Sequence, residues 1–128
     1  MTRQTESLKV GADEWKGRMM RGEPKIVYIT TDGPDEARMI GRKLVEERLA
    51  ACANILDPMT SVFRWDGGVQ EGTESVLIAK TTADRIEALT ERVIALHSYD
   101  CPCVAVVPVE GGNPAFLDWI ATETEPDI

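Results

Sequence analysis

Residues 61–80 read SVFRWDGGVQEGTESVLIAK, which is the pattern of a β-hairpin. Both arms are rich in β-branched, aromatic and other apolar residues, and the turn Asp66–Gly68 separates them. Glycine suits such a turn because it adopts positive φ angles at little steric cost. Asp57–Pro58 bends the first arm, and Gly72 in the second arm is expected to mark a bulge. The sequence therefore predicts a hairpin of residues 55–80, which is long for a small domain.

An amphipathic helix lies on each side of this hairpin in the sequence. The first is expected to follow a β-branched strand at residues 26–30 and to start near Pro34. Its first turn carries Asp35 and Glu36, which we interpret as partners of the helix dipole. The second helix is expected to open with a capping box at Thr81–Asp84. Apolar residues recur at helical spacing in these two helices and in a short last one: Ala37, Ile40, Leu44, Val45 and Leu49; Ile86, Leu89, Val93 and Leu96; Phe116, Leu117, Trp119 and Ile120.

The order of the elements predicts the fold. A strand at residues 103–109 and the last helix, opened by Asn113–Pro114, complete a β-α-β-β-α-β-α series. This is the order of a ferredoxin-like sandwich of the α+β class, in which helices cover one face of an antiparallel sheet. The other face stays uncovered, and a ribbon that extends past its own core is only marginally stable. We therefore expect a homo-oligomer in which sister copies cover both features.

The composition indicates one globular domain with an N-terminal extension. Of the 128 residues, 43% are apolar and 28% are charged, which is close to globular averages. Residues 1–24 lack strand alternation and are expected to be a flexible extension. Residues 25–128 are expected to form the domain and to end in a short polar tail.

Charge and hydropathy argue against two classes of partner. The net charge is −8, and no basic cluster is interleaved with aromatic residues, so we expect no nucleic acid partner. No apolar run approaches the roughly 18 residues that span a bilayer, so we expect no membrane partner. The start of the chain is polar, which predicts no secretory signal. Three cysteines in such a chain are expected to be free thiols in the reducing cytoplasm.

Several motifs together resemble the CutA family of divalent-cation tolerance proteins. The resemblance runs from about Lys25 to Thr122, and the residues that carry it are LAACANI at 49–55, SVFRWDG at 61–67, Lys80–Thr81, HSYDCP at 97–102 and FLDWI at 116–120. It implies a ferredoxin-like protomer in a tight homotrimer with interlocking hairpins. It also implies a role in the response to metal ions, copper above all, and no established catalytic activity. The implied trimer is similar to that of the PII signalling proteins, which bind small effectors in clefts between subunits.

The loop after the second helix departs from the family pattern. The family usually has proline where this chain has Ser98, glutamate where it has Asp100, and glutamate where it has Cys103. Ser98 is expected to loosen the turn that positions His97. Cys103 removes a carboxylate and creates a Cys-Pro-Cys sequence.

The candidate metal ligands are His97, Cys101, Cys103 and Cys52. Imidazole and thiolate are borderline and soft donors that suit copper or zinc. One loop supplies three of these ligands at most, so a further ligand would come from water or another subunit. The alternative is structural: Cys103 and Cys52 are core thiols and Cys101 is a loop thiol.

The candidate lining of an intersubunit cleft is Trp65, Glu71, Glu74, Lys80 and Tyr99. Glu71 and Glu74 are three residues apart on a strand, which places them on opposite faces and argues against a carboxylate pair. Lys80 is a candidate anion contact. The alternative is an ordinary salt-bridged ribbon that stabilises the oligomer.

Three functions stay open, and none of them is enzymatic. The chain carries no nucleophile elbow, phosphate-binding loop, dinucleotide fingerprint or zinc-protease motif, and no organic cofactor is implied. The first function is a metal-linked binding protein. The second is a PII-like sensor of a small anionic metabolite or nucleotide, and the third is a stable scaffold for a protein partner.

Overall fold

The computed structural model describes residues 22–126, so residues 1–21 of the expected extension lie outside the described part. The elements are β1 Pro24–Thr31, α2 Pro34–Glu46, β2 Cys52–Trp65, β3 Gly68–Thr82, a 3₁₀ turn Ala83–Arg85, α3 Ile86–Leu96, β4 Val104–Pro108 and α4 Pro114–Glu123. The expected β-α-β-β-α-β-α order and the α+β class are confirmed. In the part of the chain that the structure describes, no helix is long and apolar enough to span a membrane.

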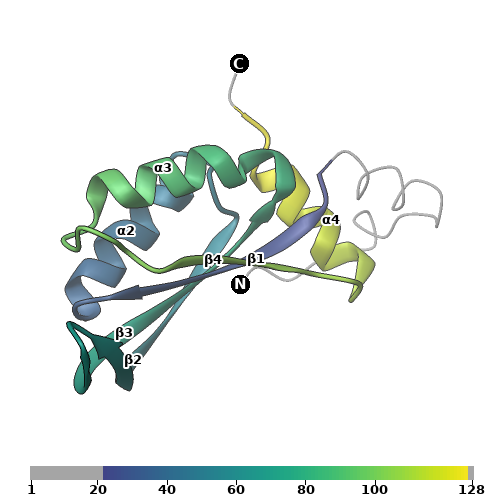
Figure 1. Ribbon diagram of the computed structural model, residues 1–128. Coiled ribbons are helices and arrows are strands. Elements are labelled where there is room, and N and C mark those ends of the chain that lie inside the picture. Colours follow the sequence, from purple (N-terminus) through teal and green to yellow (C-terminus); the bar gives the residue numbers. More distant parts are fainter. Residues whose placement is uncertain (1–21, 127–128) are drawn as a thin grey trace.

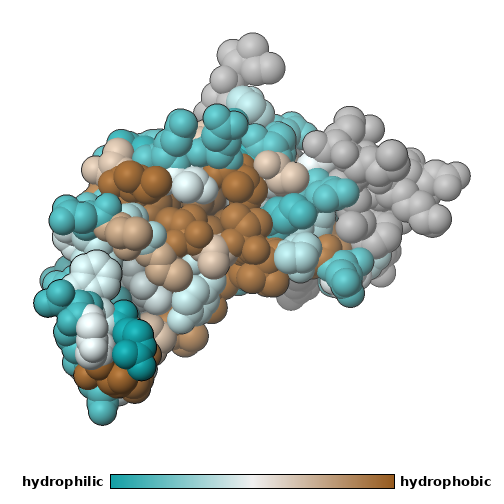
Figure 2. Space-filling model, in the orientation of Figure 1, coloured by the Kyte–Doolittle hydropathy of each residue, from teal (hydrophilic) through white to brown (hydrophobic). Residues whose placement is uncertain are grey.

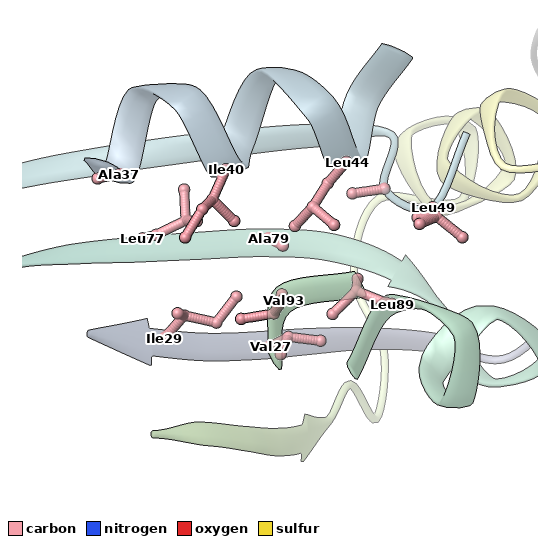
Figure 3. Close-up of a cluster of buried hydrophobic side chains, with 11 residues drawn as sticks. Val27, Ile29, Ala37, Ile40, Leu44, Leu49, Leu77, Ala79, Leu89 and Val93 are labelled. Atoms are coloured by element: carbon pink, nitrogen blue, oxygen red, sulfur yellow. The ribbon is translucent and has the colours of Figure 1, made fainter. Parts of the chain in front are cut away.

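The four strands form one antiparallel sheet in the order β2-β3-β1-β4. Helices α2 and α3 lie together over one face of it (Figure 1). The side chains of Ile40 and Leu44 point from α2 towards the sheet, where they meet those of Leu77 and Ala79 (Figure 3). All four are fully buried, because the helical apolar stripe and alternate positions of β3 face each other.

Helix α4 covers one end of the sheet, where β1 begins and β3 ends (Figure 1). The expected cap is confirmed, since the Asn113 side chain accepts a hydrogen bond from the Ala115 N–H at 3.1 Å. Leu117 and Ile120 pack with Ala51 in a second, smaller apolar cluster. Helix α4 is therefore fixed to the connection that leads into β2.

Two local expectations are wrong. Gly72 pairs regularly with Ser61, and the irregularity in the ladder lies instead between Leu56 and Met59. Proline cannot donate to the ladder, so the break falls at Asp57–Pro58. The capping box is also absent: the hydroxyl of Thr81 donates to the Leu49 carbonyl at 2.6 Å, and no side chain caps the 3₁₀ turn.

The β2–β3 hairpin extends well past the rest of the sheet. Strand β1 pairs with β3 only as far as Ser75, whereas β2 and β3 continue to pair to the turn. Asp66 and Gly67 both have positive φ angles, as the sequence of the turn predicts. Figure 2 shows hydrophobic residues over the sheet below α3 and again towards the hairpin tip. The exposed fractions of Val62, Trp65 and Val69 are 66%, 65% and 67%.

The sheet face opposite the helices is also open. Even-numbered residues of β3 point to this face, because the odd-numbered Leu77 and Ala79 point to the helices. On the two edge strands the same face carries Leu56 and Val107, whose exposed fractions are 58% and 46%. Apolar residues are thus left in solvent on both the open face and the hairpin.

Candidate functional site

His97 lies where α3 ends, and its side chain is fully buried. Its Nδ1 accepts a hydrogen bond from the Tyr99 N–H at 3.0 Å, and its Nε2 lies 2.7 Å from the Thr30 carbonyl oxygen. A backbone N–H can only donate and a carbonyl can only accept, so Nδ1 is the acceptor and Nε2 the donor in this arrangement. The Nε2 bond holds the loop that follows, residues 97–103, to the end of β1, and the Nδ1 bond lies within this loop.

Glu36 of α2 holds the same loop from the helix layer. Its carboxylate accepts hydrogen bonds from the backbone N–H of Asp32 at 3.0 Å and of Ser98 at 2.8 Å. Burial alone would raise the pKa of Glu36, but these hydrogen bonds outweigh it and hold the pKa below the ordinary value of 4.5. Proline would have no N–H to donate, so Ser98 ties the turn instead of loosening it.

Tyr99 connects the loop to the projecting hairpin. Its hydroxyl donates to one oxygen of Glu74 at 2.9 Å, and the Ser61 hydroxyl donates to the other at 2.5 Å. Burial, followed by the bond to Glu74, raises the pKa of the Tyr99 phenol well above its ordinary value. The phenol thus stays protonated and remains a donor at neutral pH. The loop joins three parts of the molecule: α2, β1 and the hairpin.

The structure brings together only two of the five candidate cleft residues, Glu74 and Tyr99. Trp65 lies at the hairpin tip, paired with Gly68. Lys80 lies near the far end of β3, where its ammonium binds the Asn54 side chain. Trp65, Glu74 and Lys80 point to the open face, while Glu71 points to the other face, as its spacing from Glu74 predicts.

A family model described as CutA1 divalent ion tolerance protein matches residues 25–123. The chain belongs to this family. The divalent-cation tolerance protein CutA of Thermus thermophilus is 45% identical over 100 residues, which are 78% of this chain and 97% of that protein. The solved structure of a divalent cation tolerance protein from the same organism has a TM-score of 0.78 and 44% identity, covering 80% of this chain and 99% of that one.

Other CutA proteins carry names that place them in different compartments. A solved structure described as the periplasmic CutA of Archaeoglobus fulgidus has a TM-score of 0.77 and 39% identity, covering 80% of this chain and 99% of that one. The chloroplastic CutA of Arabidopsis thaliana is 39% identical over 99 residues, which are 77% of this chain but 54% of that longer protein. The resemblance to CutA is confirmed, while the compartment of this chain stays a prediction.

The four candidate metal ligands of this CutA chain do not all meet within one protomer. Cys52 is half-buried at the start of β2, on one edge of the sheet, while Cys103 directly precedes β4 on the other edge. Three strand spacings of about 4.8 Å separate these edges. Across residues 22–126, no group of three or more His, Cys, Asp or Glu side chains is placed to hold a metal ion. The geometry of one chain therefore does not fit a closed divalent-metal site.

Sequence reasoning missed three groups at the loop: the Glu36 carboxylate, the Ser61 hydroxyl and the Thr30 carbonyl. Glu36 does carry a signal, because it is the third residue after the N-cap Gly33, where a glutamate reaches back to bind backbone N–H groups. The contact of Ser61 with Glu74 follows from the hairpin register, in which Met59 pairs with Glu74. No local pattern marks the Thr30 carbonyl.

Proposed function

We propose that this CutA chain works as a homotrimer that binds metal ions, copper above all, as part of the response to metal stress. The observation that carries the proposal is the apolar surface left on the open sheet face and on the projecting hairpin. Exposed apolar surface of this kind is typical of an interface. Burial of Leu56, Trp65 and Val69 between copies would remove it from water.

The hairpin supports a closed assembly for a second reason. Between the turn and Ser75, the edge of β3 that would face β1 has no strand partner among residues 22–126. The outer edge of β2 has none either. Unpaired edges of this length favour pairing with another chain unless they are covered. Interlocking hairpins would satisfy these backbone groups. The resemblance to the family supports three copies as the closed arrangement.

Shared clefts between protomers follow from this assembly. We place Trp65, Glu71, Glu74, Lys80 and Tyr99 at or near them, with the Tyr99–Glu74 hydrogen bond as the fixed point. The net charge of −8 favours the approach of cations over that of anions. This negative charge supports metal ions over an anionic metabolite as the ligand. No catalytic step is proposed.

Native mass spectrometry of the full chain tests the proposal. The protein is measured as purified, and again after addition of CuCl₂ or of a panel of nucleotides. We expect a trimer that retains copper. A trimer that ignores copper but retains a nucleotide would replace the metal function with metabolite sensing, and a trimer that retains neither would favour a protein scaffold.

A further inference from the structure

We infer that Cys101 and Cys103 form a two-thiolate site for monovalent copper, and that His97 takes no part in it. The inference rests on the proposed link to copper and specifies the oxidation state and the ligands. Both cysteines are free and exposed, with one residue between them. Cys52, the third cysteine, lies on the opposite edge of the sheet.

The contacts of His97 decide the ligand set. Metal binding through Nε2 would require loss of its proton and of the bond to the Thr30 carbonyl. Binding through Nδ1 would displace the Tyr99 N–H, and the ring is fully buried in either case. Either event leaves a backbone group beside the buried ring without its partner, which is unfavourable. His97 is therefore not available as a ligand, and the two cysteines are the soft donors that the loop offers.

Two sulfur ligands select the ion. Thiolates are soft donors that favour Cu(I), whereas Zn²⁺ in a structural site takes four ligands. Within residues 22–126 no third His, Cys, Asp or Glu joins the pair. Cu(I), which favours sulfur ligands, therefore fits this pair better than a divalent ion that needs four ligands. Binding would release one proton from each thiol and form two copper–sulfur bonds with no change in the oxidation state of copper.

The backbone holds the two cysteines in place before any ion arrives. On one side, the loop is fixed by the hydrogen bonds of His97, Ser98 and Tyr99. On the other side, β4 begins at once, with Val104 paired to Ile29. Between the cysteines, Pro102 has a fixed φ angle and also restricts the residue before it. Little backbone conformational entropy is therefore lost when the cysteines bind an ion.

Copper(I) competition under anaerobic conditions tests the site in the full chain. The protein is titrated against the coloured Cu(I)–bicinchoninate complex, and loss of colour reports transfer of copper to the protein. We expect one Cu(I) per chain in the unmodified protein, and loss of this transfer in both Cys101→Ser and Cys103→Ser. Cys52→Ser is the matched control and keeps it. In the unmodified protein, the NMR signals of the His97 ring nitrogens should not shift when Cu(I) is added, because both nitrogens keep their hydrogen bonds.

Each outcome bears on a different claim. Transfer that survives in both Cys101→Ser and Cys103→Ser overturns this site but leaves the proposed copper function in place. A shift of the His97 ring-nitrogen signals on addition of Cu(I) makes the histidine a ligand and overturns the two-thiolate assignment. A chain that binds neither Cu(I) nor Cu²⁺ overturns the site and the proposed copper function together.

Discussion

The phenol of Tyr99 donates a hydrogen bond to the Glu74 carboxylate at 2.9 Å, and this bond joins the 97–103 loop to the projecting hairpin. The two residues are 25 positions apart in the sequence and belong to different layers of the protomer. Their contact fixes the loop against the part of the molecule that we expect to meet other copies.

Removal of the Tyr99 hydroxyl should destabilise the protein. In Tyr99→Phe the Glu74 carboxylate keeps only its bond from Ser61. A hydrogen bond to a charged acceptor is worth about 1.5–3 kcal/mol, and partial exposure places the expected loss at the lower end. Urea unfolding at a fixed protomer concentration measures it. Tyr28→Phe is the matched control, because its hydroxyl meets only the weak acceptor sulfur of Met59, and an equal loss in both variants would contradict the account.

Restoration of the family proline at position 98 should raise the pKa of Glu36. Ser98→Pro removes both the N–H and the hydroxyl that donate to the Glu36 carboxylate, whereas Ser98→Ala removes the hydroxyl alone and should raise the pKa less. Fewer donors stabilise the charged form less, so the pKa moves up towards its ordinary value. NMR titration of the Glu36 side-chain carboxyl carbon measures it. An unchanged pKa in Ser98→Pro would show that this bond does not hold the carboxylate.

The fold is largely readable from the sequence, while the loop contacts are not. Alternation in the strands and helical spacing in α2 and α3 report burial, and burial determines the layers. The hydroxyls of Thr81 and Thr82 have an ordinary capping pattern, yet they bind Leu49 and Thr124, which are far away in the sequence. The buried contact of His97 with Thr30 is likewise a product of tertiary packing, so the motif alone suggested a metal ligand.

Stability should fall in acid partly through Glu36. Because its folded pKa lies below the ordinary value, the carboxylate contributes stability above that value and loses it as the pH falls through the folded pKa. Urea unfolding between about pH 6 and about pH 3 should therefore show a steeper loss in the unmodified protein than in Glu36→Gln. Parallel pH profiles for the two proteins would argue against this role.

A charge at the hairpin tip should weaken the assembly without unfolding the protomer. Trp65→Glu places a carboxylate at a residue with an exposed fraction of 65%, so the cost falls on the interface and not on the core. Ala95→Glu adds the same charge on the exposed side of α3 and serves as the control. Light scattering after size-exclusion chromatography should show a smaller mass for Trp65→Glu alone. Equal masses for both variants would remove the tip from the interface.

The mass of the unmodified protein in solution tests the central claim most directly. Sedimentation equilibrium at micromolar protomer concentration should give three times the 14.1 kDa mass of one chain, with no concentration-dependent dissociation. A folded particle of 14.1 kDa would mean that the open face and the hairpin stay in water, and it would contradict the proposal of a shared-cleft assembly.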